Sequence, residues 1–139
     1  MKTRILTAIA VLVSAYVHLK LWFDGFRDLH VVGPAFLLNA VAGLVIAAGL
    51  VLWRHWLPPL LAVGFGLSTL GAFVISATVG LYGVHEVWSG SYVLAAAASE
   101  VVAIVGGAAV LVLERPAATG PTSARQPEHR FALRRAHLH

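Results

Sequence analysis

Four polar side chains interrupt otherwise apolar stretches of this chain and could together support chemistry inside a membrane. They are His18, Asn39, Ser76 and Glu100, and each falls in a different apolar stretch. A carboxyl group in a membrane-spanning segment is costly and marks a candidate functional site. If the inner faces of the four segments converge, these side chains form one polar pocket. The alternative is a buried hydrogen-bonded cluster that serves packing alone.

A metal or haem site is a second interpretation of the polar residues, because imidazole and carboxylate groups suit transition metals. The candidate ligands are His18, His30, His85, Glu86 and Glu100. No pair of them has the spacing of a metal motif such as H-x-x-E-H, and a bis-histidine haem would need two histidines at matched depth. The chain has no cysteine, which excludes thiolate metal sites, iron–sulfur clusters and disulfides.

The composition indicates a membrane protein. Of the 139 residues, 59% are hydrophobic and 12% are charged, whereas a soluble domain has about 25% charged residues. Mean hydropathy is +0.83. Four apolar stretches, 5–23, 34–53, 60–82 and 91–113, are each long enough to span a bilayer. Short loops between them predict one all-α domain over residues 1–113, an integral membrane up-down four-helix bundle.

The two ends of the chain need separate interpretation. The first stretch could be a signal peptide cut after Val13-Ser14-Ala15, but its apolar character continues through the cut to Trp22 and Phe23. We therefore expect a true span. Residues 114–139 are rich in proline, glycine, serine and arginine and keep no apolar period, which predicts a basic disordered tail.

Small residues recur every four positions in the third stretch, so they share one face of a helix. They are Gly64, Ser68, Ala72, Ser76 and Gly80. Such a stripe lets helices approach closely in lipid, which favours a packing face. A homodimer seam and the wall of a cavity are the alternatives.

The distribution of Lys and Arg predicts the orientation. Eight of the ten lie at the termini and in the second loop, and two lie on the other side, which places both termini in the cytoplasm of a plasma-membrane protein. At the helical rise, His18 and Asn39 then lie about 8 Å, Ser76 about 9 Å and Glu100 about 14 Å below the outer ends. The inner half is expected to be apolar. Lipid, not nucleic acid, is the expected partner of the basic tail, which suits an anionic leaflet.

The function favoured by these residues is an accessory or binding membrane protein without catalysis of its own, with a polar pocket in its outer half. No nucleophile motif or phosphate-binding loop is present. The alternatives are a metal- or haem-binding redox protein and a proton-linked carrier, which would act as a homo-oligomer. Small multidrug transporters also have four spans and one membrane carboxylate, but theirs lies in the first span.

A resemblance to known proteins rests on two segments. They are Ser14-Ala15-Tyr16-Val17-His18-Leu19-Lys20-Leu21-Trp22 and Gly33-Pro34-Ala35-Phe36-Leu37-Leu38-Asn39. Residues 5–113 resemble four-span membrane proteins of actinobacteria and, more distantly, DoxX-like four-helix proteins. The resemblance implies the four-helix membrane fold. The DoxX-like similarity suggests an association with redox or stress chemistry.

Overall fold

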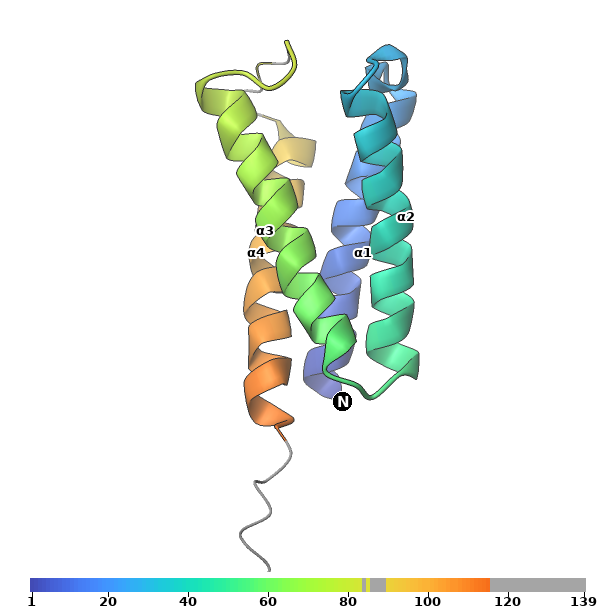
Figure 1. Ribbon diagram of the computed structural model, residues 1–139, viewed down its shortest axis with the longest axis vertical. Coiled ribbons are helices and arrows are strands. Elements are labelled where there is room, and N and C mark those ends of the chain that lie inside the picture. Colours follow the sequence, from blue (N-terminus) through green and yellow to red (C-terminus); the bar gives the residue numbers. More distant parts are fainter. Residues whose placement is uncertain (84, 86–89, 116–139) are drawn as a thin grey trace, which may run out of the picture.

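Four long helices make up almost all of the computed structural model, which describes residues 1–83, 85 and 90–115 (Figure 1). They are α1 (Lys2–Phe23), α2 (Val32–Leu52), α3 (Leu57–Thr78) and α4 (Ser91–Leu113), with a short 3₁₀ turn, η1 (Phe26–Asp28), after α1. Each has 21 to 23 residues and is apolar enough to cross a membrane. At about 1.5 Å per residue, each spans a hydrocarbon core of about 30 Å. The predicted all-α four-helix bundle is confirmed, and the predicted tail lies mostly outside the described residues.

The helices alternate in direction, and their packing is uneven. α1 packs along α2 and α4, and α3 packs along α4, whereas α2 and α3 make the weakest contact between chain neighbours. Figure 1 shows why: α2 and α3 lie close together at the turn that joins them, and α3 leans away toward the opposite end. The bundle is open along the side where these two helices diverge, because side chains of both line a cleft there.

The ends of α3 differ from the expected 60–82. The helix begins at Leu57, so Pro58 and Pro59 occupy its first turn, where the amide hydrogen that proline lacks has no intrahelical acceptor. It ends at Thr78, and Gly80 and Tyr82 follow with φ angles of 83° and 49°. These left-handed conformations interrupt a right-handed helix.

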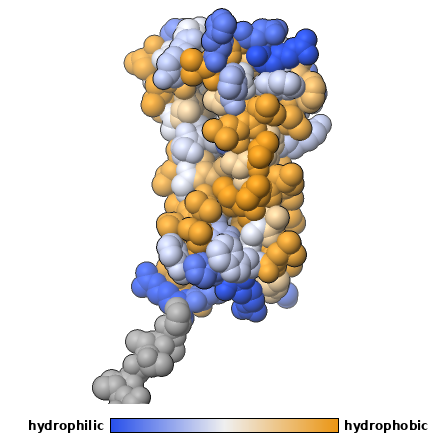
Figure 2. Space-filling model, turned by 45° about the vertical axis from the view of Figure 1, so that its right-hand side comes forward, coloured by the Kyte–Doolittle hydropathy of each residue, from blue (hydrophilic) through white to orange (hydrophobic). Residues whose placement is uncertain are grey.

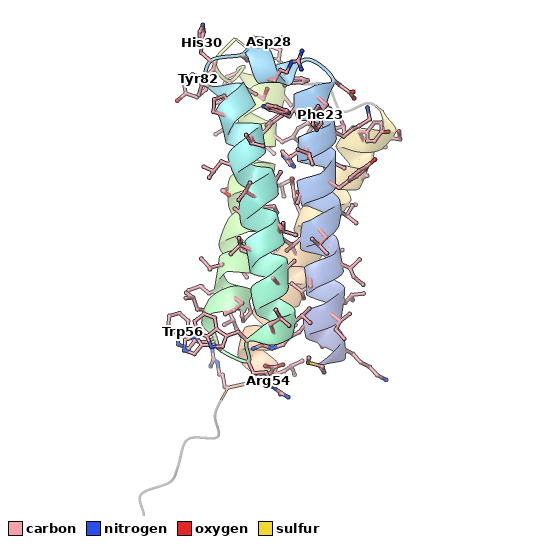
Figure 3. All side chains as sticks on the ribbon, turned by 90° about the vertical axis from the view of Figure 1, so that its right-hand side faces the viewer. Phe23, Asp28, His30, Arg54, Trp56 and Tyr82 are labelled. Carbon is pink, nitrogen blue, oxygen red and sulfur yellow. The ribbon has the colours of Figure 1, made fainter. Side chains whose placement is uncertain are left out.

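The surface has the layered character of a membrane protein. Figure 2 shows that the middle of the visible face is mostly apolar and that hydrophilic groups gather at both ends. Exposed aromatic side chains lie near both edges of this apolar middle: Trp53 and Trp56 at one end, Phe23 and Tyr82 at the other (Figure 3). Aromatic residues favour the membrane–water interface, so these side chains lie where the two edges of a bilayer would be expected.

Close helix contacts depend on glycine. A Cβ atom added at Gly66 would lie 2.7 Å from the carbonyl oxygen of Glu100, and one at Gly107 would lie 2.7 Å from the carbonyl oxygen of Pro59. Both positions press α3 against α4. The backbone around Glu100 is thereby held against α3.

A buried arginine ties three helices together at the end of the bundle where the chain begins. Arg4 is 2% exposed. Its guanidinium donates to the Glu114 carboxylate at 2.7 Å and to the carbonyl oxygens of Trp53 at 3.0 Å and His55 at 2.9 Å. The half of the bundle that was expected to be apolar therefore ends in a buried, paired charge: Arg4, counted only among the basic residues of the N-terminal side, joins α1, α2 and the end of α4.

Candidate functional site

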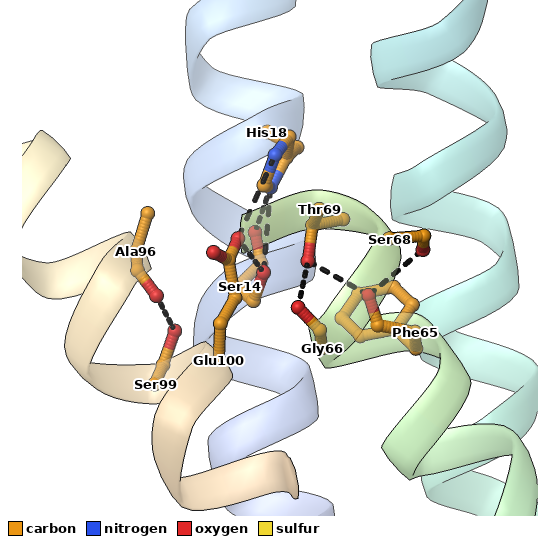
Figure 4. A network of polar contacts seen from close by, with 9 residues as sticks. All are labelled: Ser14, His18, Phe65, Gly66, Ser68, Thr69, Ala96, Ser99 and Glu100. Carbon is orange, nitrogen blue, oxygen red and sulfur yellow. Dashed lines mark hydrogen bonds and ion pairs between the residues drawn. The ribbon is translucent and has the colours of Figure 1, made fainter. Parts of the chain in front are cut away.

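A histidine and a glutamate from different helices meet in the half of the bundle that carries η1. His18 of α1 and Glu100 of α4 face each other with 4.0 Å between Nε2 and Oε1, and Glu100 is 2% exposed. Ser14, one helical turn before His18, is fully buried and donates its hydroxyl to Glu100 Oε1 at 3.2 Å. Figure 4 shows this network between α1 and α4, with α3 beside it.

The hydrogen bonds of His18 fix which ring nitrogen carries hydrogen. Nδ1 lies 2.8 Å from the backbone oxygen of Ser14. A carbonyl oxygen only accepts, so Nδ1 must be the donor. In the neutral ring, Nε2 is then an acceptor, and it is the atom that faces the Glu100 carboxyl.

Thr69 of α3 lies beside the network of Ser14, His18 and Glu100 (Figure 4). Its hydroxyl donates to the carbonyl oxygen of Phe65 at 2.8 Å, within α3 itself. A hydroxyl has one hydrogen, so Thr69 has none left for a further acceptor while the bond to Phe65 persists.

The open side of the bundle is a cleft of about 800 Å³ between α2 and α3. Its wall is mostly aliphatic and aromatic, and none of the described residues that line it is an Asp, Glu, Lys or Arg. The polar lining groups gather toward the end that carries η1, whereas Ile46, Leu60 and Leu61 line the other end. The polar groups are His18, Asn39, Ser68, Thr69, Ser76 and Tyr82.

The four residues expected to form one pocket divide between the cleft and the space behind it. His18, Asn39 and Ser76 all line the cleft. Glu100 is not among the lining residues, and it touches His18 from the far side. The amide nitrogen of Asn39 is covered by protein atoms and has no hydrogen-bond partner among the described residues.

The small-residue stripe of α3 follows the same cleft. Gly64, Ser68, Ala72 and Ser76 line it, and a Cβ atom at Gly64 would meet nothing within 4 Å. Gly80, the fifth member, lies beyond the end of the helix. Within this chain the stripe therefore forms a cavity wall, and the close packing of α3 on α4 uses Gly66 instead.

The proposed metal ligands are spread over the molecule. His30 lies in the loop after α1, and the His85 ring lies against Gly80. Glu86 falls outside the described residues. Among the residues that the structure describes, no three His, Cys, Asp or Glu side chains gather to hold a metal ion.

Two members of the site were missed in the sequence. Ser14 precedes His18 by four residues, so helical periodicity alone places both on one face. Thr69 had no comparable signal, because its role depends on the rotation of α3 relative to α4. Nothing in the sequence distinguishes Arg4 from an ordinary charge at the start of a span.

The fold and the apolar middle of the visible face define a multi-pass membrane protein built as a four-helix bundle. No protein-family model, curated protein or solved structure matches the chain.

Proposed function

We propose that this chain is a binding protein of the plasma membrane whose α2–α3 cleft holds a neutral amphiphile dissolved in the bilayer. The amphiphile has a long apolar body and a carbonyl or hydroxyl oxygen at one end. It enters sideways from the lipid, because the cleft is open along the bundle. The protein binds this molecule and does not transform it.

The size of the cleft suits a small molecule. Ligand pockets usually occupy about 300–1,000 Å³, and this cleft measures about 800 Å³. If each non-hydrogen atom takes about 30 Å³, as a water molecule does in the liquid, about 25 such atoms fit. A C20 isoprenoid alcohol has this size.

A helix from another protein fits less well. A helix about 10 Å wide and 30 Å long occupies roughly 2,400 Å³, about three times the volume of the cleft. A second copy of this chain could therefore cover the cleft but not fill it.

The polarity of the ligand follows from Asn39, which is the observation that carries the proposal. Its buried amide nitrogen has no partner among the described residues, and an unpaired donor in an apolar medium is costly. Ser68 and Thr69 donate their hydroxyl hydrogens to Phe65. Because Asn39 lines the cleft, rotation of its side chain would bring this donor to a ligand oxygen.

The direction of the ligand follows from the gradient along the cleft. Its oxygen would lie near Asn39 and its apolar body against Ile46, Leu60 and Leu61. By the count of Lys and Arg, both termini are cytoplasmic. The ligand head then lies in the outer leaflet half of the bundle.

Two glycines of α3 give a matched test. Gly64 lines the cleft and Gly71 does not, and a Cβ atom would meet nothing within 4 Å at either. We expect Gly64→Phe to lower labelling by a photoreactive C20 isoprenoid alcohol at least fivefold in nanodiscs. The added ring fills roughly 200 Å³ at about 30 Å³ per atom. Gly71→Phe should label like the wild type.

A competition experiment with a C20 hydrocarbon that has no oxygen tests the polarity of the ligand. The hydrocarbon should compete with the probe at least tenfold less well than the unlabelled alcohol, because it cannot pair with Asn39. Equal labelling of the two glycine variants would exclude the cleft. Equal competition by the alcohol and the hydrocarbon would exclude recognition of the oxygen and would mean that lipid tails fill the cleft without specificity.

A further inference from the structure

The contact between His18 and Glu100 is incomplete without a proton. His18 Nδ1 donates to the Ser14 carbonyl oxygen, so a neutral ring presents the lone pair of Nε2. Glu100 Oε1 lies 4.0 Å from that nitrogen, and an ionised carboxylate also presents lone pairs. Two acceptors that face each other repel. One proton on either group turns the contact into an attraction.

The pair can hold its proton in two arrangements, either on the His18 ring or on the Glu100 carboxyl. Ser14 donates to Oε1, which suits a carboxylate beside a charged imidazole. The other arrangement is a protonated carboxyl beside a neutral ring, in which Glu100 donates toward the lone pair of Nε2. Both arrangements leave the pair neutral overall, as an apolar setting requires.

Other charges lie away from this pair or are already paired. α2 and α3 contain no charged or titratable residue, and Glu100 is the only charged residue of α4. In α1, Arg4 is paired with Glu114 at the opposite end, and Lys20 is paired with Asp24. The remaining titratable groups of α1 and α4 inside the membrane are Tyr16 and Tyr92, and Tyr92 lies against Lys20. No second charge within these helices competes for the proton.

The pair is also joined to the cleft. The His18 ring lines the cleft and meets the Phe36 ring edge-on, with 5.2 Å between centroids. While the proton is present, the Nδ1 hydrogen bond and the attraction across the 4.0 Å contact hold the ring toward Glu100. Without it, repulsion from the carboxylate favours rotation of the ring about its side chain, toward the cleft that it borders.

We propose that His18 and Glu100 form a binding site for one proton on the wall of the cleft, and that the proton-loaded pair admits the cleft ligand. The coupling rests on the proposed function, whereas the proton site does not. The protein binds its amphiphile together with a proton and gives up both together. Such a site is the minimum that a proton-linked carrier needs.

Nitrogen NMR of histidine-labelled protein in nanodiscs tests the proton site without any ligand. We expect His18 Nδ1 to stay protonated at every pH and the Nε2 signal to shift in one transition, whether the proton is on Nε2 or on the carboxyl that faces it. Glu100→Gln should move that transition by at least about one pH unit, because the titration belongs to the pair. Ser99→Ala is the control, since Ser99 donates to Ala96 and not to Glu100. A transition that ignores Glu100→Gln, or a deprotonated Nδ1, would overturn the site.

Labelling by the photoreactive C20 alcohol across the same pH range tests the coupling. We expect labelling to fall as pH rises through the His18 transition, by at most about tenfold per pH unit because one proton is exchanged. In Glu100→Gln, labelling should not depend on pH in that range. Labelling that is present but independent of pH in the wild type would refute the coupling alone. Absence of labelling at every pH would refute the proposed function and the coupling together, and the NMR result would still decide the proton site.

Discussion

Replacement of Arg4 by methionine should destabilise the bundle strongly, although Arg4 lies in the first turn of the first helix. Methionine keeps the length and apolar stem of the side chain and removes the charge and its donors. The change leaves the carbonyl oxygens of Trp53 and His55 and the carboxylate of Glu114 without their donor. These groups fix the end of α2 and the turn into α3, so the effect should reach three helices.

The magnitude follows from the individual bonds. A hydrogen bond to a charged group contributes about 1.5–3 kcal/mol, and the two carbonyl bonds, at 3.0 and 2.9 Å, are well formed. The contact with Leu50 at 3.4 Å is too long to count fully. Glu114 is 25% exposed, so water can replace part of its loss. A cost of about 3 kcal/mol results, close to the range for removal of one partner of a buried pair.

Reversible unfolding in mixed detergent micelles, followed by circular dichroism, measures this cost. Lys2→Met is the matched control, because Lys2 lies in the same turn and is exposed. Glu114→Gln should cost about 1 kcal/mol, since the carbonyl contacts of Arg4 persist. If the free energies of unfolding of Arg4→Met and Lys2→Met differed by less than about 1 kcal/mol, Arg4 would not hold the three helices together.

Three further predictions concern the helices and their orientation. Asn39→Leu should raise the free energy of unfolding in the same assay by about 1 kcal/mol, because a buried unpaired donor is removed. It should also abolish the preference of the cleft for the alcohol over the hydrocarbon. A loss of stability would mean that the Asn39 amide is paired. Gly66→Val should destabilise the bundle by at least about 2 kcal/mol more than Gly71→Val, since a Cβ at Gly66 would lie 2.7 Å from a backbone oxygen of α4; equal effects would contradict the close approach of α3 and α4. A topology reporter inserted at Asp28 should be active outside the cytoplasm and one at the C-terminus inside it, and the reverse pattern would invert the expected orientation.

The fold could be predicted from composition because lipid leaves the backbone few choices. Every peptide group within the hydrocarbon layer needs an internal partner, so four long apolar stretches become four helices. The ends of α3 were harder to predict. Whether Pro58 ends a turn or begins a helix, and where Gly80 interrupts one, depends on backbone angles that hydropathy does not record.

The site could be predicted only in part, because hydropathy gives the depth of a residue but not the rotation of its helix. Depth placed His18 and Glu100 near each other, and they do meet. Rotation decides that Asn39 and Ser76 line a cleft with His18 while Glu100 lies behind it. The spacing of the small residues of α3 likewise predicts that they share one face of the helix, but it does not predict that this face lines the cleft.

The most direct measurement of the central claim is a map of the residues that the photoreactive C20 alcohol labels in nanodiscs. Cleavage and mass spectrometry should locate the label on the facing walls of the cleft, at residues such as Ala42 of α2 and Ala72 of α3. An excess of the unlabelled alcohol should remove it. Label spread evenly over outward-facing residues such as Leu44 and Val105, which are 62% exposed, would contradict a binding site in the cleft.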